Sequence, residues 1–522
     1  MDTDTERSTG ASEGLDDAAS ASPRCISCEE LELARVRDQA PSQTLPIPNA
    51  ALAGFPEGRD SSALTRRRLL QYGLAGFAAV YAPRALGFES VWESAVAEGA
   101  VAPSNQLVVL YLAGGNDGLN ALVPASNADY AAYQSARPVL SRGLGATAGG
   151  RVGSQPLPGA AGGQLNLANV LVSSSGGGDN GSSQFGLDKL YGDGTGGAGN
   201  KLALLPAVDF LPANLSHFES SDHWFAGTTS GLTTGWLGRW LDRNGSQSNP
   251  LQAISIDTAL SKTIRTQQAP VCAIPSLSSL GFTMNPSGGY GLPGGGVNNA
   301  LDANATLAGL AGVPAGAQNI HLARSRATYG TAVDVYTKAK ALGAVPANPN
   351  YPSSSLSTKL KLAAHMLGAG LGTRIVTVHW GSFDTHGSQL SGQDPQLQTL
   401  SLALGAFQAD LQARGIDQNV ATLVFSEFGR RVGENGSFGT DHGVGGLMML
   451  SGTPVQGGWA STFPGLTGGG IDGNGNLKAT TDCRSVYQHV LSEWMGDDPT
   501  AILGQSFPAV SRPDGFAGLF RP

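Results

Sequence analysis

Charged residues are scarce in this chain of 522 residues: they make up 14% of it, against 41% hydrophobic residues. No Lys/Arg-rich run occurs outside Arg66–Arg68, and the net charge of −8 comes from scattered acids. We therefore do not expect nucleic acid or an anionic membrane surface as a partner. A chain of this length and apolar content can bury a sizeable core, which predicts one large domain, with or without an appendage.

Cysteine is also rare, with four residues in two pairs. Cys25 and Cys28 form a C-x-x-C with no second pair of ligands nearby, which favours two cysteines in a discarded leader over a zinc site. Cys272 and Cys483 lie far apart, and their spacing leaves open whether they form a disulfide after export. No cysteine cluster, haem motif or convincing dinucleotide fingerprint is present, which argues against an exported oxidoreductase.

Glycine is abundant, with 74 residues that cluster with Ser, Asn and Asp and show no collagen period. Such segments are typical of long surface loops. Residues 140–200 and 284–318 are of this kind, and we expect them to be insertions at the rim of the domain, as flaps over a site. Residues 1–64 are rich in Asp, Glu, Ser and Pro, which predicts a disordered N-terminal extension.

An export signal of the twin-arginine type is predicted over residues 65–97, centred on Arg66 and Arg67. A weakly apolar stretch, Tyr72–Ala82, follows and is too short for a comfortable bilayer span, so we expect no permanent membrane anchor. Ala95–Ala97 supplies a small-x-small cleavage site, which predicts a mature start near Glu98. The twin-arginine translocase is the implied partner, and the mature protein is expected to be periplasmic, at the cell surface or secreted.

Short apolar runs alternate with helical patterns in the rest of the chain. The runs predict buried strands, and they cover Gln106–Leu112, Lys201–Leu205, Ala253–Ile256, Arg374–His379, Ala421–Phe425 and Leu447–Leu450. The helical patterns cover Leu356–Leu371, Leu397–Arg414 and Arg484–Trp494. This alternation predicts an α/β fold over residues 98–522, with a mostly parallel sheet covered by helices on both faces.

Several of the predicted strands are followed by side chains that can bind metal ions. They are Asp117, Asp384, His386, Glu427, Asp441 and His442. Each of them alone is equally well explained as a turn residue or a surface histidine. However, ligands of open parallel sheets bind beyond the carboxyl ends of the strands, and three separate strand ends deliver an acid here. The pattern therefore predicts a shared site for a divalent ion, and the mixture of carboxylate and imidazole favours a transition metal over Mg²⁺ or Ca²⁺.

At these residues the chain resembles the exported bacterial proteins grouped as domain of unknown function 1501 (DUF1501). The resemblance spans roughly residues 104 to 520. It rests on Leu107–Asn120, Ser216–Glu219, Gly235–Arg239, Phe383–Gly387, and Ser426–Arg431 through Asp441–Gly443.

This resemblance implies an alkaline phosphatase-like fold, because that family is placed with the alkaline phosphatases and sulfatases. Members of this superfamily use one or two divalent metal ions to hold a phosphate or sulfate ester. Asp117, Asp384, His386 and His442, the last with Asp441, match the superfamily's metal ligands. Glu427 stands where the superfamily has an Asp-His pair, and this departure makes one metal ion (Zn, Mn, Mg or Ca) the expectation.

The resemblance also implies a Ser or Thr nucleophile where a helix begins. Ser216 and Ser220 are the candidates, although Ser216 is equally well explained as a helix cap. His217 is a candidate for substrate or metal binding. Arg430 and Arg431 are candidates for an anionic group of the substrate, although two arginines beside a carboxylate also make structural ion pairs.

Two absent motifs narrow the possible chemistry. The chain has no Cys-x-Pro-x-Arg or its Ser equivalent, as formylglycine sulfatases have, and no Gly-x-Ser-x-Gly elbow in the right place. The resemblance still implies a function, which is metal-dependent hydrolysis of a phosphate or sulfate ester. The alternative is a non-catalytic exported protein that keeps the fold and binds a surface polysaccharide or a protein.

Overall fold

The computed structural model describes residues 105–146, 152–157, 164–173, 185–192, 200–277, 335, 339, 341–348 and 350–522. Several predictions lie outside these residues: the extension 1–64, the signal segment 65–97 with Arg66 and Arg67, the Cys25/Cys28 pair and the insertion 284–318. Among the described residues, no helix is long and apolar enough to cross a membrane.

A central mixed sheet organises the domain, in the order β13-β5-β12-β9-β1-β8-β6-β7, with β14 also paired to β5. β9, β1, β8, β6 and β7 run parallel to one another. β12 is antiparallel to both of its neighbours, β5 and β9. The bounds are β1 Gln106–Leu112, β5 Leu202–Asp209, β6 Ala253–Ser255, β7 Cys272–Ala273, β8 Ile375–Trp380, β9 Val420–Phe425, β12 Gly446–Ser451, β13 Gly458–Trp459 and β14 Thr481–Asp482.

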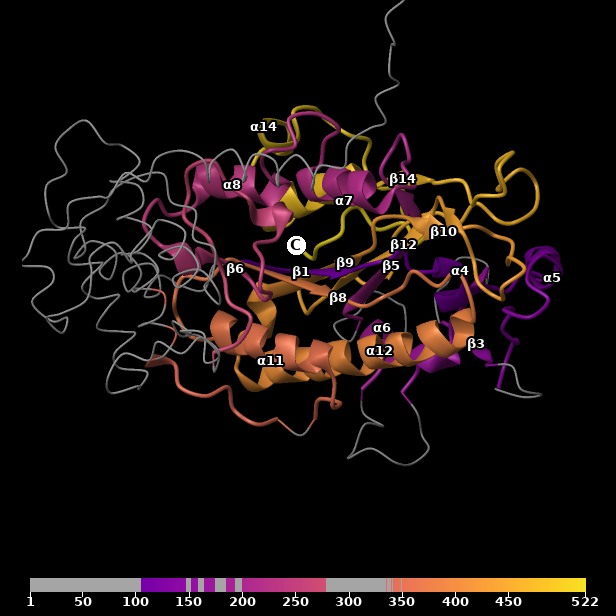
Figure 1. Ribbon diagram of the computed structural model, residues 1–522, viewed down its shortest axis with the longest axis horizontal. Helices are drawn as coiled ribbons and strands as arrows, with labels where there is room; N and C mark the ends of the chain where they lie inside the picture. Colours follow the sequence, from indigo (N-terminus) through magenta and orange to yellow (C-terminus); the bar gives the residue numbers. More distant parts are fainter. Residues whose placement is uncertain are drawn as a thin grey trace, which may run out of the picture. The chain divides into compact units, whose positions relative to one another are not determined.

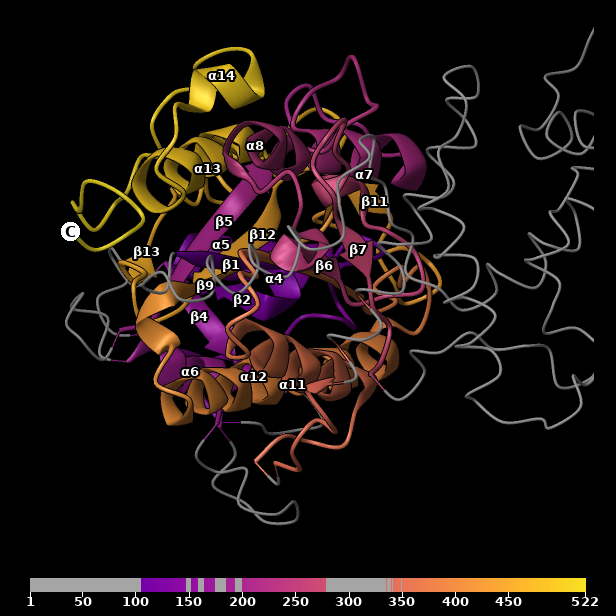
Figure 2. The same cartoon turned by 90° about the vertical axis from the view of Figure 1, so that its left-hand side faces the viewer.

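Helices cover both faces of this sheet (Figures 1 and 2). On one face lie α7 (His217–Ala226), α8 (Trp236–Asn244), α13 (Cys483–His489) and α14 (Pro499–Leu503). On the other lie α6 (Leu187–Tyr191), α11 (Ser355–Leu367) and the long α12 (Gln389–Ala413). α13 continues into a π-helical turn, Val490–Trp494. The predicted α/β class, with a mostly parallel sheet between helices, is confirmed.

The two helical layers enclose separate cores because side chains of β1 alternate between the faces of the sheet. Val108, Leu110 and Leu112 pack on the α11/α12 side, whereas Leu107 and Val109 pack on the α7/α8 side. The two cysteines of the domain follow the same division. Cys272 lies in the first core and Cys483 in the second, and both thiols are free and buried. The disulfide that their spacing left open is not formed.

The segment 140–200, predicted as an insertion, is described only in part. Its β3 (Ser154–Pro156) and β4 (Leu165–Ala168) form a small antiparallel sheet with β2 (Leu122–Pro124), in the order β2-β4-β3. Leu165, Leu167 and Leu187 of this segment belong to the core on the α12 side. The described parts of this segment therefore contribute to the core, although the glycine content suggested only loops.

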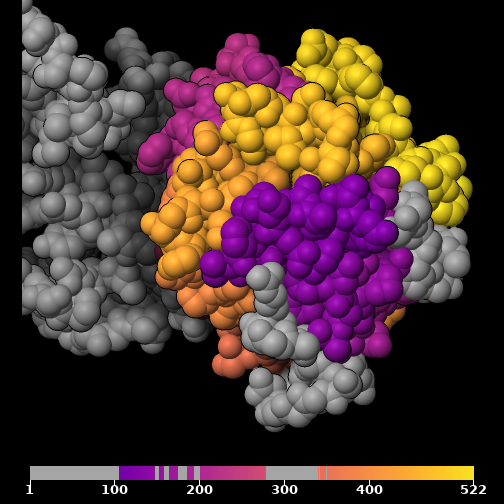
Figure 3. Space-filling view, turned by 90° about the vertical axis from the view of Figure 1, so that its right-hand side faces the viewer, coloured from indigo at the N-terminus to yellow at the C-terminus, as the bar shows by residue number. Residues whose placement is uncertain are grey.

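After β1 the chain forms α4 (Gly118–Ala121), β2 and α5 (Asn127–Ala136) at one edge of the domain. Figure 3 shows this indigo segment lying beside the orange residues that follow β9. Hydrogen bonds join them: the Glu434 amide donates to the Ala136 carbonyl, and the Arg137 side chain donates to the Val432 carbonyl. The orange segment includes a two-stranded ladder of β10 (Gly429–Arg430) and β11 (His442–Gly443).

Candidate metal centre

The carboxyl ends of β1, β8 and β9 meet at one edge of the sheet, because these three strands are parallel neighbours. The turn after β1 supplies Gly114 and Gly115, the turn after β8 supplies Asp384, and Glu427 follows β9. Gly114 has φ +111°, and a Cβ there would lie 2.4 Å from the Asp384 amide nitrogen. Only glycine therefore lets the two turns approach this closely.

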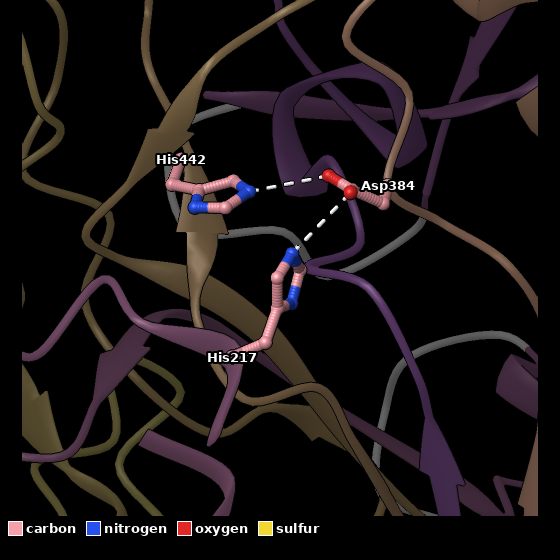
Figure 4. Close-up of side chains that lie close together, drawn as sticks. All are labelled: His217, Asp384 and His442. Atoms are coloured by element: carbon pink, nitrogen blue, oxygen red, sulfur yellow. Dashed lines mark hydrogen bonds and ion pairs between the residues drawn. The ribbon is translucent and has the colours of Figure 1, made fainter. Parts of the chain in front are cut away.

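His217, Asp384 and His442 form a group whose ligand atoms all lie within 4.8 Å of one another. The Nε2 atom of His442 lies 3.1 Å from Asp384 Oδ1, and the Nε2 atom of His217 lies 3.3 Å from Asp384 Oδ2 (Figure 4). His217 is the first residue of α7, Asp384 follows β8, and His442 opens β11. Three segments that are distant in sequence thus direct two imidazoles and one carboxylate to one point.

The hydrogen bonds of the two histidines fix their tautomers. His442 Nδ1 lies 2.9 Å from the Leu215 carbonyl, and His217 Nδ1 lies 2.7 Å from Glu427 Oε1. A carbonyl and a carboxylate only accept hydrogen bonds, so each Nδ1 is assigned as the N–H donor. In the neutral rings both Nε2 lone pairs then face the Asp384 carboxylate, which also only accepts. Acceptor atoms gathered in this way require a cation between them, either a proton or a metal ion.

Asp384 is held in its charged form. Partial burial opposes its ionisation, but the hydrogen bond from Arg430, the contact with the His442 ring in its protonated form and the charge of Arg430 outweigh this effect and lower the pKa of Asp384 to about 2. Burial lowers the pKa of His442, although the Leu215 carbonyl and Asp384 act in the opposite direction. An ionised carboxylate beside a neutral imidazole is the protonation state that metal binding requires.

His386 and Asp441 lie at the open side of this group. His386 Nε2 lies 3.0 Å from both Asp384 Oδ1 and His442 Nε2, and its Nδ1 lies 3.2 Å from Asp441 Oδ1. The side chains of His386 and Asp441 are each about half exposed. His386 is therefore placed to add a third imidazole nitrogen to a bound ion, whereas Asp441 contacts the far side of that ring.

Asp117, which the sequence grouped with the metal ligands, does not join this group. Its carboxylate is buried and pairs with the guanidinium of Arg137, at 2.6 Å to Nη1 and 3.1 Å to Nη2. The side-chain amide of Gln389 also donates to it, and Asp117 caps α4 by accepting from the Leu119 amide. These contacts occupy both oxygens, so Asp117 is placed as a structural anchor of the loop after β1.

The two adjacent arginines differ in their surroundings. The Arg430 side chain is 0% exposed and donates to Asp384 and to four backbone carbonyls, those of Gly114, Gly115, Phe383 and Thr440. It is thereby held away from any substrate. Arg431 is exposed, and its charge contributes to lowering the pKa of Asp441, after the hydrogen bond from Asn435. Of the two, only Arg431 is open to an anion at the surface.

The two candidate nucleophiles, Ser216 and Ser220, also differ in their solvent exposure. Ser220 is buried, and its hydroxyl donates to the Glu427 carbonyl. Ser216 is exposed at the N-cap of α7, next to His217, and its hydroxyl makes no capping hydrogen bond. Glu219, three residues further on, accepts from Asn214 and forms no capping box with Ser216.

Sequence reasoning missed the partners that orient these side chains. Arg137 lies twenty residues beyond the Asp117 that it holds, and nothing in its local sequence marks it. The Leu215 carbonyl that orients His442 is a backbone group, which no sequence motif can reveal. His217 was a candidate for substrate or metal binding, and its place at the start of a predicted helix was the available signal.

Comparison with known families agrees with the motifs. The family model of DUF1501, described as a protein of unknown function, matches residues 322–468 and supports membership of that family. The matched segment carries Asp384, His386 and His442, whereas His217 lies outside it. Neither the curated proteins nor the solved structures contain a match to this chain.

Proposed function

We propose that this protein is an exported, metal-dependent hydrolase of phosphate or sulfate esters with an alkaline phosphatase-like fold. A single divalent ion would be held by His217, Asp384 and His442. The observation that carries the proposal is the convergence of two imidazole Nε2 atoms on the ionised Asp384 carboxylate. Three ligands of this kind suit a transition metal such as zinc and leave a position for substrate.

When bound, a divalent ion would act as a Lewis acid on an oxygen of the ester. The protein supplies the other parts of the reaction. Ser216 is the nucleophile in this proposal, because its exposed hydroxyl is next to His217 and is not used to cap α7. Arg431 binds an anionic oxygen of the substrate with its exposed guanidinium. The buried Arg430 keeps Asp384 ionised and oriented.

Export rests on the twin-arginine-type motif at Arg66 and Arg67, and we propose the twin-arginine translocase as the partner in export. Fusion of residues 1–97 to a reporter that is active only outside the cytoplasm tests this proposal. An Arg66→Lys/Arg67→Lys variant should abolish reporter activity. Reporter activity that persists in this variant would contradict the proposed route.

Metal content by mass spectrometry tests the site itself. We expect about one divalent ion per chain in the wild type, and loss of that ion in Asp384→Ala and His442→Ala. His223→Ala is a matched control, because His223 lies on α7 outside the group and should leave the metal content unchanged. A wild-type protein that binds no divalent ion would refute the proposed function.

Turnover of generic phosphate and sulfate esters separates catalysis from binding. Hydrolysis that is lost in both metal-site variants and in Ser216→Ala would support the proposed hydrolase. A bound metal ion without turnover of any ester would favour the alternative, a non-catalytic exported protein that binds a surface polysaccharide or protein. Hydrolysis that is unchanged in Ser216→Ala would remove Ser216 as the nucleophile.

A further inference from the structure

Glu427 lies behind His217 in the candidate metal centre and contacts none of the other proposed ligands. Its side chain is 1% exposed, and its Oε1 atom lies 2.7 Å from His217 Nδ1. The opposite ring nitrogen, Nε2, is the one that faces Asp384. Glu427 and Asp384 therefore lie on opposite sides of the imidazole, and Glu427 does not share the point on which the ligand atoms converge.

We infer that Glu427 is a positioning residue, which holds the His217 imidazole with its Nε2 lone pair directed at the metal ion. The inference rests on the proposed function, because it assigns a role at the same site. It differs from the sequence-based expectation, in which Glu427 is itself a ligand. In the inferred role, Glu427 acts through His217 and touches neither metal nor substrate.

The surroundings of Glu427 fix its carboxylate in place. The Gly114 amide donates to Oε1 at 2.9 Å, and the Gly115 amide donates to Oε2 at 3.2 Å. The Ser426 hydroxyl lies 3.0 Å from Oε2. The Ser426 proton is directed to the nearer Leu112 carbonyl, at 2.5 Å, so the donors to Glu427 are the two amides and His217 Nδ1. If the carboxylate turned toward the metal, the buried Gly114 N–H, which donates to both of its oxygens, would be left unpaired.

The turn after β1 has a shape that suits this task. Gly114 and Gly115 have φ of +111° and +77°, in the region that residues with a Cβ rarely adopt. Their successive amides point at the one buried carboxylate. The loop after β1 thus holds Glu427 in place, and Glu427 orients His217.

A carboxylate on Nδ1 has two consequences for His217. It fixes the neutral ring in the tautomer that carries its proton on Nδ1, and it makes Nε2 a stronger donor to a metal ion. The Nδ1 atom of His442 instead contacts a neutral carbonyl, that of Leu215. Of these two histidines, His217 is therefore the one whose metal bond depends on a buried negative charge.

The first test measures metal affinity in the full chain. Zn²⁺ is titrated against a chromophoric chelator in the wild type, in Glu427→Gln and in Glu219→Gln. Glu219 is an exposed carboxylate on the same helix as His217 and makes no contact with that ring, so Glu219→Gln is the charge-matched control. We expect roughly 10- to 100-fold weaker Zn²⁺ binding in Glu427→Gln, the range typical for residues that orient a ligand, and no change in the control.

The outcomes of this titration separate the inference from the function on which it rests. Wild-type protein that binds Zn²⁺ with Glu427→Gln unchanged would overturn the inference and leave the proposed function intact. Wild-type protein that binds no divalent ion, either in this titration or by mass spectrometry, would refute the proposed function. Circular dichroism checks that the Glu427→Gln variant is folded.

The second test needs no substitution at Glu427 and no metal ion. Two-bond ¹⁵N–¹H spectra of the ¹⁵N-histidine-labelled, metal-free protein report which ring nitrogen carries the proton. Spectra are taken about two pH units above the ordinary imidazole pKa of ~6.5, and the His217 signal is assigned by its loss in His217→Gln. We expect the proton on Nδ1. A proton on Nε2 of His217 would overturn the inference whatever the metal affinity.

Discussion

The buried pair of Asp117 and Arg137 gives a sharp prediction, because the sequence indicated a metal ligand where the structure has an ion pair. In an Asp117→Ala variant, the Arg137 guanidinium, which is 0% exposed, loses its only charged partner in the described part of the chain. Removal of one member of a buried pair costs about 3–5 kcal/mol. Arg137 keeps its hydrogen bonds to Asn120 and to two backbone carbonyls, so we expect the lower end, about 3 kcal/mol.

Denaturant unfolding followed by tryptophan fluorescence measures this loss. Asp222→Ala serves as the control, because Asp222 pairs with Lys262 at the surface, and such pairs contribute at most about 1 kcal/mol. A double variant, Asp117→Ala/Arg137→Met, should recover part of the loss, since it removes the uncompensated buried charge.

Metal content decides between the two roles of Asp117. We expect the folded Asp117→Ala protein to bind as much metal as the wild type, because both Asp117 oxygens are engaged by Arg137, Gln389 and a backbone amide. Loss of the metal ion with little change in stability would refute this reasoning and restore Asp117 as a ligand.

Two further predictions concern buried groups away from the metal centre. Burial raises the pKa of Asp209 from 3.8 to about 7, against the opposing hydrogen bonds from the amides of Gly445 and Phe210. An acid whose pKa is higher in the folded than in the unfolded state destabilises the fold as pH rises between the two values. We therefore expect the free energy of unfolding to fall by roughly 3 kcal/mol between pH 4 and 7 on account of this group, and Asp209→Asn to flatten that part of the stability profile. A profile that Asp209→Asn leaves unaltered would contradict the assignment. For Cys272 and Cys483, we expect no alkylation by iodoacetamide in native buffer and full alkylation in denaturant without reductant, read by peptide mass spectrometry; a disulfide-linked peptide would disprove the free thiols.

Much of the fold was predictable because its central strands are buried on both faces. Gln106–Leu112 was predicted as a strand and forms one with the same bounds, and the runs near residues 375 and 420 form its two neighbours. A continuous apolar run signals such a strand but not its direction. This is why the antiparallel course of β12 was not predicted.

Helix α8 was not predicted, although its sequence carries a usable signal. Trp236, Leu237, Trp240 and Leu241 recur at the spacing of one helical face, and all four are buried in the core on that side. The small sheet β2-β4-β3 is a different case, because its strands have three or four residues each. Elements of that length leave no periodic pattern to detect.

The sequence predicted which residues lie together at the site better than it predicted the role of each residue. Asp384, His386 and His442 were expected together, and they do lie together. The roles of Glu427 and Asp117 depend on which nitrogen faces which oxygen. Glu427 contacts His217, which lies about two hundred positions earlier in the chain, and Asp117 contacts Arg137. Composition and spacing do not indicate either of these contacts.

The position of Phe428 bears on how many metal ions the site can bind. Under the proposed alkaline phosphatase-like relationship, Glu427 and Phe428 would stand where that superfamily has an Asp-His pair. The Phe428 ring is buried and packs on the rings of His217 and His442, at 4.9 Å and 4.4 Å between centroids. A hydrocarbon ring there offers no donor to an ion, and Glu427 is used to orient His217. Glu427 and Phe428 thus both support the group of His217, Asp384 and His442, and neither supplies a ligand for a second metal ion. This is the physical reason to expect one metal ion.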